Sequence, residues 1–221
     1  MSSEAGRRHR FSVALLGIDG AGKTTVARSL VRRSRARGDA ASLYRHPGGR
    51  KTLDNVARRF NSTAEAALGS QGLTVIETVT RSLAVIRSAV QSRRRDGLVV
   101  FDRYIHCQIA LRRMRGLHSS PFLQWLLTTL PRPDVIVFFD ISPRQAHARI
   151  LARGIDTEPL AMLCELDAAY RQLSDFDDFY RIDAGRPVAD VVDELEAVIC
   201  AAAKRKAAHG LVISPSSTIQ S

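Results

Sequence analysis

The sequence predicts an α/β protein whose parallel sheet is covered by helices on both faces. Short apolar runs alternate with longer segments of helical periodicity along most of the 221 residues. In addition, the apolar runs at residues 98–101 and 135–139 are continuous, which is typical of strands buried on both faces. Alternation of strands and helices favours a parallel sheet, because each helix returns the chain to the same edge.

Five strands are expected, at residues 11–17, 41–45, 98–101, 135–139 and 179–182. Helices are expected at residues 23–37, 55–68, 75–95, 105–115, 122–130, 143–153, 158–173 and 188–206. Pro143 stands at the start of its helix, where its missing N–H costs nothing. One domain is predicted at residues 11–206, between a disordered basic arm (1–10) and a C-terminal tail (207–221).

Composition limits the class of protein. There is no apolar run of about 18 residues or more, so no membrane span is expected. The first ten residues are polar and basic and the apolar run after them is short, which predicts a cytoplasmic protein. The cysteines, Cys107, Cys164 and Cys200, are far apart and match neither a disulfide framework nor a metal pair, so buried or idle thiols are expected.

The net charge of +11 comes mostly from arginine. Such an excess is compatible with nucleic acid, an acidic surface or small phosphorylated ligands. The arginines are scattered through the predicted helices, and only Arg93, Arg94 and Arg95 form a tight run. We interpret that run as a solvated helix end, because cations suit a helix C-terminus, and nucleic acid is not the expected partner.

A glycine-rich loop carries the clearest chemical signal. Residues 17–24 read Gly-Ile-Asp-Gly-Ala-Gly-Lys-Thr between the first predicted strand and the first predicted helix. In that context the motif is a phosphate-binding loop, because glycines let successive N–H groups point at one anion and the helix adds partial positive charge. The sequence therefore predicts a three-layer P-loop NTPase fold that binds ATP with Mg²⁺. The expected nucleotide-binding residues are Gly17, Asp19, Gly20, Ala21, Gly22, Lys23, Thr24 and Thr25.

Two carboxylates, Asp102 and Asp140, each close a predicted buried strand at the edge where parallel sheets bind ligands. Asp102 is the better Mg²⁺ partner for Thr24, because a guanidinium (Arg103) and an aromatic ring (Tyr104) follow it directly. Asp140 is instead expected to cap the turn before the next helix.

Arg149 and Arg153 share one face of a predicted helix that Gly154 can end. Two guanidiniums beside a flexible loop suit a lid, near residues 149–160, that closes over phosphates. A merely solvated arginine face fits the spacing equally well. His46, His106 and His118 match no metal spacing and are expected to be satisfied polar or loop residues.

These motifs together resemble the thymidylate kinase family of nucleoside monophosphate kinases, over about residues 11–199. The resemblance is carried by residues 17–25, Arg45-His46-Pro47-Gly48-Gly49, Asp102-Arg103-Tyr104, residues 149–154 and Ile182-Asp183-Ala184. It implies transfer of the γ-phosphoryl group of ATP to a (deoxy)nucleoside monophosphate, with a mobile lid and a homodimer.

The resemblance also implies roles for single residues. Lys23 would hold the donor phosphates, Thr24 and Asp102 the Mg²⁺, and Asp19 would lie near the acceptor sugar. Arg45 and Arg103 would grip the acceptor phosphate and Tyr104 would pack beside the sugar. The implied catalytic residues are Lys23, Arg103, Arg149, Arg153 and Asp19, and the implied acceptor-binding residues are Arg45, Arg81, Arg103 and Tyr104.

The acceptor half departs from the family pattern. His46 replaces a usual Glu, and Leu111-Arg112 stand in place of a Tyr-Gln pair that approaches the base. No stacking phenylalanine precedes Arg81, and the usual Asp-Arg-x-Glu of the lid reads Asp156-Thr157-Glu158. Two alternatives therefore stay open: a P-loop kinase with a different small-molecule acceptor, and a non-catalytic nucleotide-binding switch.

Overall fold

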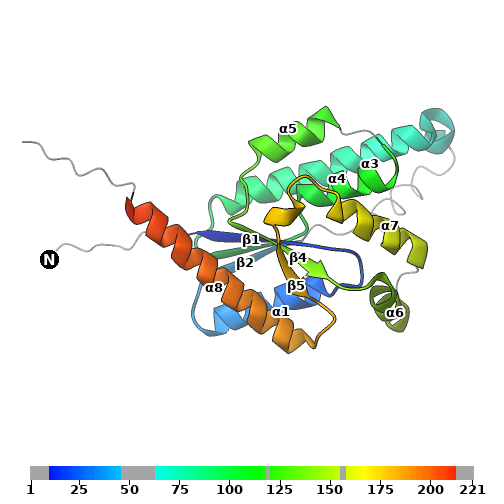
Figure 1. The fold of residues 1–221 in the computed structure, drawn as a ribbon. Helices are drawn as coiled ribbons and strands as arrows, with labels where there is room; N and C mark the ends of the chain where they lie inside the picture. Colours follow the sequence, from blue (N-terminus) through cyan, green and yellow to red (C-terminus); the bar gives the residue numbers. More distant parts are fainter. Residues whose placement is uncertain (1–9, 46–62, 118–119, 155–157, 213–221) are drawn as a thin grey trace, which may run out of the picture.

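The computed structural model describes residues 10–45, 63–117, 120–154 and 158–212, and it has the predicted α/β architecture (Figure 1). Five parallel strands form one sheet in the order β2-β3-β1-β4-β5. The strands are β1 (Phe11–Leu16), β2 (Ala41–Arg45), β3 (Leu98–Asp102), β4 (Val135–Asp140) and β5 (Tyr180–Asp183). Because every strand runs the same way, all carboxyl ends meet at one edge, where the phosphate loop follows β1.

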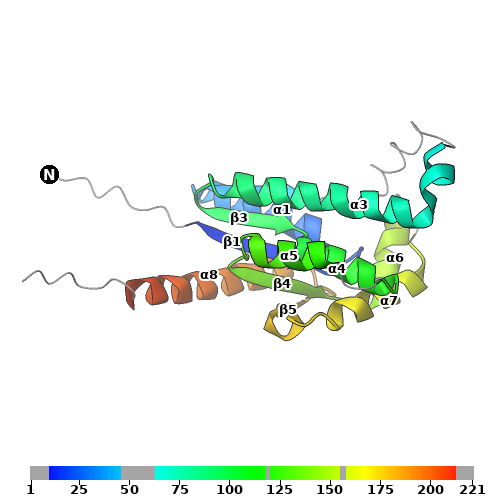
Figure 2. The same cartoon turned by 90° about the horizontal axis from the view of Figure 1, so that it is seen from above.

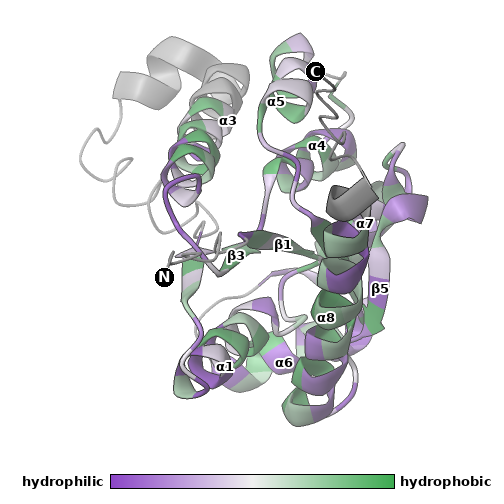
Figure 3. Ribbon diagram, turned by 90° about the vertical axis from the view of Figure 1, so that its left-hand side faces the viewer, coloured by the Kyte–Doolittle hydropathy of each residue, from purple (hydrophilic) through white to green (hydrophobic). Residues whose placement is uncertain are grey.

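Helices cover both faces of the sheet, as Figures 2 and 3 show from two directions. On one face lie α1 (Lys23–Ala36) and α8 (Val188–Val212), and on the other α3 (Thr63–Ser92), α4 (Ile105–Met114) and α5 (Pro121–Thr129). Near the carboxyl ends of the strands lie α6 (Pro143–Arg153) and α7 (Leu160–Arg171), and the short turn η1 (Phe176–Asp178) precedes β5. The predicted three-layer arrangement is confirmed.

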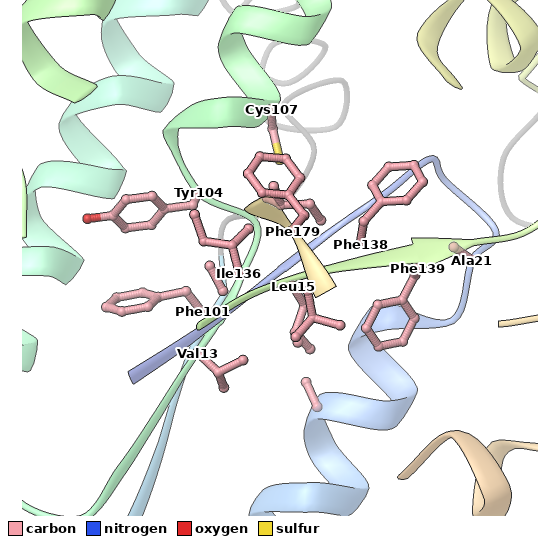
Figure 4. Close-up of a cluster of buried hydrophobic side chains, with 14 of the residues drawn as sticks. Val13, Leu15, Ala21, Phe101, Tyr104, Cys107, Ile136, Phe138, Phe139 and Phe179 are labelled. Atoms are coloured by element: carbon pink, nitrogen blue, oxygen red, sulfur yellow. The ribbon is translucent and has the colours of Figure 1, made fainter. Parts of the chain in front are cut away.

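The core lies where β1, β3 and β4 meet the helices (Figure 4). All six residues of β1 are buried, as the continuous apolar run predicts for a central strand. Val13 and Leu15 of β1 are joined in the core by Phe101 of β3 and by Ile136 and Phe138 of β4. Each large side chain removed from water here stabilises the fold by about 1.5–3 kcal/mol, which fixes the strand ends that carry the site.

Two helices, α3 and α8, differ most from the prediction. The sequence predicts a break between helices at residues 69–74, but α3 runs without interruption from Thr63 to Ser92. Gly69 and Gly72 cost a helix only about 1 kcal/mol each, which is not enough to break it. Helix α8 continues to Val212, six residues past the predicted end at 206, because the added residues include the good helix formers Ala207, Ala208 and Leu211.

Parts of the predicted chain organisation lie outside the described residues. These are residues 1–9 of the predicted basic arm, residues 55–62 of the predicted helix at 55–68, and residues 213–221 of the predicted tail. None of the helices in the described ranges combines the length and the apolar character that crossing a bilayer requires.

Candidate active site

The phosphate loop occupies residues 17–22, between the end of β1 and the start of α1. Gly22 is the N-cap of α1 and adopts a left-handed backbone with φ of 86°, which glycine reaches without strain. At Gly20 a Cβ atom would lie 2.4 Å from the carbonyl oxygen of Ala146 in α6, so only glycine lets the loop approach that helix. The loop is thereby held with the unpaired N–H groups of the first turn of α1 facing its concave side.

Lys23 lies inside this loop and is only 4% exposed. Its Nζ donates to the carbonyl oxygens of Gly17 and Ile18, at 2.8 and 2.6 Å. Burial, assisted by the nearby Arg103 cation, lowers the pKa of Lys23 to about 8. The carboxylates of Asp19 and Asp102 partly oppose that shift. A phosphate anion bound in the loop would favour the charged amine and raise the pKa again.

Thr24 and Asp102 meet beside the loop. Thr24 Oγ1 donates to Asp102 Oδ2 at 2.5 Å, and Asp102 is 5% exposed. The other carboxylate oxygen, Oδ1, is buried and has no hydrogen-bond partner among the described residues. A buried, unpaired carboxylate oxygen next to a hydroxyl is a donor set that suits a hard cation such as Mg²⁺. The described residues hold no cluster of three or more His, Cys, Asp or Glu side chains that could bind a metal, so nucleotide and water oxygens would complete the shell.

Among the described residues other than glycine, only Arg103 has a positive φ, at 82°. Its N–H donates to the carbonyl of Leu15 at 3.1 Å, which ties it to β1. Its guanidinium pairs with the carboxylate of Asp19 in the phosphate loop. Backbone strain of this kind is found at functional sites when the surroundings hold it in place.

The Asp19–Arg103 pair is electrostatically compensated. Burial alone would raise the pKa of Asp19, but the Arg103 and Lys23 cations outweigh it and hold that pKa well below its ordinary value. Asp19 in turn raises the pKa of Arg103. Glu158, near the far end of the predicted lid, also contributes to lowering the pKa of Asp19. The site thus contains an ion pair that is already formed when no ligand is bound.

Tyr104 packs into the core directly behind Arg103. It is 2% exposed, and its hydroxyl donates to the carbonyl of Pro131 at 2.6 Å. Its ring packs against Phe101, with centroids 5.3 Å apart, and burial raises its pKa to about 12. The ring and hydroxyl of Tyr104 are thus anchored in the core, and its contact with an acceptor sugar stays a prediction.

The predicted lid arginines differ from each other. Arg149 Nη1 and Nη2 donate to the carbonyls of Ala184 and Gly185, at 2.8 and 3.1 Å, in the loop between β5 and α8. Arg153 is exposed at the end of α6, and Gly154 caps that helix with φ of 62°. Residues 155–157 of the predicted lid lie outside the described residues. Helix α6 thus connects the phosphate loop, through Ala146, with the β5–α8 loop.

The other predicted acceptor residues come from two elements. Arg45 is exposed at the end of β2, where its backbone pairs in register with Asp102, so it shares the edge of the phosphate loop. Arg81 is half-buried on α3, which packs against α4. Leu111 and Arg112 are half-buried in the second half of α4. His46 and His118 lie outside the described residues.

Tyr170 of α7 interacts with residues of the site, and the sequence does not indicate this. It is fully buried, packs on Phe138 with centroids 5.5 Å apart, and hydrogen-bonds Cys107. Burial raises its pKa well above the usual value, and the charges of Arg103 and Asp19 act on it. Helical spacing with Leu163 and Leu166 indicates its inward face, but nothing in the sequence connects it with Arg103.

Two further polar residues take structural roles. Asp140 pairs with Arg171 of α7 at 2.6 Å, whereas the cap before α6 is Ser142, whose Oγ accepts from the N–H of Gln145 at 3.3 Å. The cap predicted at Asp140 is therefore wrong by two residues, because the arginine offers the carboxylate a stronger partner. His106 is buried with Nε2 3.0 Å from Asp175 Oδ2, whereas its Nδ1 is buried and has no hydrogen-bond partner among the described residues, so the expected satisfied polar residue is found for one ring nitrogen.

Comparison with known proteins adds an independent result. A family model described as thymidylate kinase matches residues 16–195. A probable thymidylate kinase of Archaeoglobus fulgidus is 25% identical over 189 residues, which cover 85% of this chain and 93% of that protein. A thymidylate kinase of Mycoplasmopsis agalactiae is 24% identical over 192 residues, covering 81% and 89%. The matched segment contains the phosphate loop, the Asp102-Arg103-Tyr104 triplet and both lid arginines.

Proposed function

This chain belongs to the thymidylate kinase family and is a nucleoside monophosphate kinase, and we propose that it moves the γ-phosphoryl group of ATP onto a (deoxy)nucleoside monophosphate. The observation that carries the proposal is the juxtaposition of two units at one sheet edge. One is the phosphate loop with Lys23 and the Thr24–Asp102 contact, and the other is the Asp19–Arg103 pair.

The donor half of the site supports ATP binding with Mg²⁺. Lys23 and the first-turn N–H groups of α1 would neutralise and orient the donor phosphates. Thr24 and Asp102 would hold Mg²⁺, which lowers the charge on the phosphate oxygens when it is bound. Asp102 has a buried oxygen ready for that cation or its water shell.

The acceptor half supports a substrate that carries a phosphate. Arg103 and Arg45 stand at the same sheet edge, and a guanidinium matches a phosphate in bidentate geometry. The acceptor phosphate would compete with Asp19 for Arg103 and would leave that carboxylate facing the sugar. No general base is required, because a phosphate monoester is already an anionic nucleophile at neutral pH. We assign Arg81 to acceptor binding, and Arg149 and Arg153 to charge neutralisation around the transferring group.

A coupled ADP-release screen over nucleoside monophosphates tests the proposal, with thymidylate and its deoxy relatives first. We expect turnover on at least one of them, with Lys23→Ala as the inactive control. The replacement of the usual Tyr-Gln pair by Leu111-Arg112 favours a changed base preference rather than loss of the reaction. ADP release only with non-phosphorylated acceptors would favour the small-molecule kinase alternative, and ATP binding without any turnover would favour the nucleotide switch.

We further propose that the enzyme is a cytoplasmic homodimer. Helix α3 exposes Val79, Leu83 and Val90, whose spacing places them on one face. Phe122 and Trp125 are stacked and exposed on α5, on the same side of the sheet. Light scattering after size-exclusion chromatography should report a dimer that Leu83→Glu converts to a monomer. Exposed Leu151→Glu on α6 is the matched control, and a wild-type monomer would refute the dimer.

A further inference from the structure

The sheet edge opposite the phosphate loop gathers cations that are far apart in the sequence. Arg10, just before β1, donates from Nη2 to Ser92 Oγ at 2.9 Å, which puts its guanidinium at the end of α3. The arginine run that follows Ser92 is exposed to solvent. We call the following set the basic edge: Arg10, Arg93, Arg94, Arg95, Arg132, Arg205 and Lys206.

Hydrogen bonds and charge interactions connect members of the basic edge to one another. Lys206 of α8 donates from Nζ to the carbonyl of Arg10 at 3.2 Å and to Asp134 Oδ1 at 2.7 Å. Figure 1 shows this end of α8 beside the start of β1. Tyr104 connects further members. Burial raises the pKa of Tyr104, and the nearby positive charges of Arg10 and Arg93 partly oppose that rise. The hydroxyl of Tyr104 donates to the carbonyl of Pro131, the residue before Arg132. The set is therefore contiguous.

The carboxylates nearby do not balance this charge. Against the seven cations of the basic edge, Arg132 pairs with Asp178 at 3.3 Å and Lys206 pairs with Asp134 at 2.7 Å. Asp96 follows the arginine run directly in the sequence. Asp134 is also hydrogen-bonded within the fold: its Oδ2 accepts from the N–H and the hydroxyl of Ser12, at 2.7 and 2.8 Å. The neighbouring Arg37–Asp39 pair adds no net charge. Exposed ion pairs contribute at most about 1 kcal/mol to stability, so folding does not account for this concentration of charge.

A groove opens inside the basic edge and contains an aromatic ring. It has a volume of about 480 Å³ and lies between the start of β4, the start of β5 and the end of α8. Three cations (Arg132, Arg205 and Lys206) and two carboxylates (Asp134 and Asp178) line it, which leaves an excess of one positive charge. Tyr180 stands in its wall with 41% of the residue exposed. A cationic groove with an exposed aromatic side chain is the arrangement that binds single-stranded nucleic acid, because phosphates meet the cations and a base stacks on the ring.

We propose that the basic edge binds single-stranded nucleic acid, with a base stacked on Tyr180 and phosphates held by the arginines and Lys206. The inference differs from what the sequence predicts, because the arginines are scattered along the chain and only the fold collects them. A membrane surface is less suitable, since monotopic binding requires apolar side chains that enter the lipid, and the exposed ring beside these cations, Tyr180, lies in a groove. The site is separate from the kinase site, at the other edge of the sheet.

Fluorescence anisotropy of the full chain with a labelled oligothymidylate of about 12 nucleotides tests the proposal. We expect binding whose log affinity falls linearly with log salt, by about 0.7 per phosphate contacted. Excess ATP should leave the oligonucleotide bound, because the kinase site is elsewhere. Complete displacement by ATP, or binding only to vesicles of anionic lipid, would overturn the proposal.

Matched variants assign the contacts. Arg94→Ser/Arg95→Ser should reduce the salt slope by about 1.4, two phosphate contacts. Tyr180→Leu should weaken binding about tenfold, the effect of one stacked base, without changing the slope. Arg28→Ser/Arg32→Ser removes the same charge from an exposed part of α1 and should leave the salt slope and affinity near wild type. An equal loss of oligonucleotide affinity and salt slope in both double variants would mean a diffuse charge effect and would overturn the proposal. An oligonucleotide affinity of Tyr180→Leu equal to that of the wild type would refute the stacking and would also overturn it.

Discussion

The two edges of the sheet both carry positive charge, but they hold it in different ways. At the carboxyl edge, Lys23 is buried and bonded to loop carbonyls, and the half-buried Arg103 is bonded to Asp19. At the amino edge Arg93, Arg94 and Arg95 are exposed. Salt screens buried charges little, so they interact strongly with a ligand that fits their fixed positions. Salt screens exposed charges strongly, so several of them must contact the same ligand to bind it. The first edge suits a small phosphorylated substrate, and the second suits a polymer of phosphates.

The largest effect on turnover is expected from a substitution in the carboxyl edge. Lys23→Ala removes the cation that neutralises the donor phosphates, so turnover should fall by at least about a hundredfold. The ADP-release assay measures this, and circular dichroism checks the fold. Arg28→Ala on the exposed side of the same helix is the control. Near-wild-type turnover of Lys23→Ala would remove the donor-site assignment.

The second effect separates donor from acceptor binding within that edge. Arg103→Ala removes a charged hydrogen-bond donor worth about 1.5–3 kcal/mol, so the KM for the acceptor should rise about 10- to 100-fold. Calorimetric titration should find ATP binding retained. Arg103→Lys keeps the charge without the planar fork and should lie between wild type and Arg103→Ala. Equal loss of ATP and acceptor affinity would show that Arg103 has a different role.

The third effect uses the buried environment of Lys23. Because the pKa of this amine in the free protein is about 8, it loses its proton as the pH rises above that value. The kcat/KM for ATP should then fall about tenfold per pH unit, while kcat falls only at higher pH, since bound phosphate favours the charged amine. Steady-state pH profiles test this. A kcat/KM that is flat well above pH 8 would contradict the depressed pKa.

The same shift affects stability with a definite sign. A lysine whose pKa is lowered by folding binds fewer protons in the folded state than in the unfolded state, between pH about 8 and its usual value. Its contribution to the free energy of unfolding should therefore increase as the pH rises through that interval. Lys23→Met should lose this increase in denaturant titrations of the ligand-free protein.

A smaller effect tests the core position of Tyr104. Tyr104→Phe removes the hydrogen bond to Pro131 and should lower the free energy of unfolding by about 1 kcal/mol. Steady-state constants for both substrates should stay near wild type, because the hydroxyl points away from the site. A raised acceptor KM in Tyr104→Phe, with an unchanged free energy of unfolding, would instead support the contact with the acceptor sugar that the family resemblance implies.

The smallest expected effect sharpens the contrast between the edges. Arg94→Ser/Arg95→Ser should leave kcat and KM for both nucleotides within about twofold of wild type, as expected for distant, independent sites. The ADP-release assay checks this under the salt conditions of the oligonucleotide experiment. A large loss of turnover would mean that the two edges are coupled.

Local signals in the sequence predicted much of this protein. The continuous apolar runs located β3 and β4, because strands covered on both faces need no polar alternation. The phosphate loop was predictable since its glycines, its lysine and the following helix are consecutive in the chain. The break expected near Gly69 and Gly72 was wrong, because intrinsic propensity decides a helix less than its surroundings do.

The sequence by itself determined the fold class, the phosphate loop and the Asp102-Arg103-Tyr104 triplet that closes β3. Only the tertiary structure decided where long side chains bind: Tyr104 on Pro131, Arg149 on the β5–α8 loop, and Arg10 on the end of α3. The reason is that these partners are between 27 and 82 residues apart. Periodicity and motifs report neighbours in the chain, whereas the sheet brings distant segments together at its two edges.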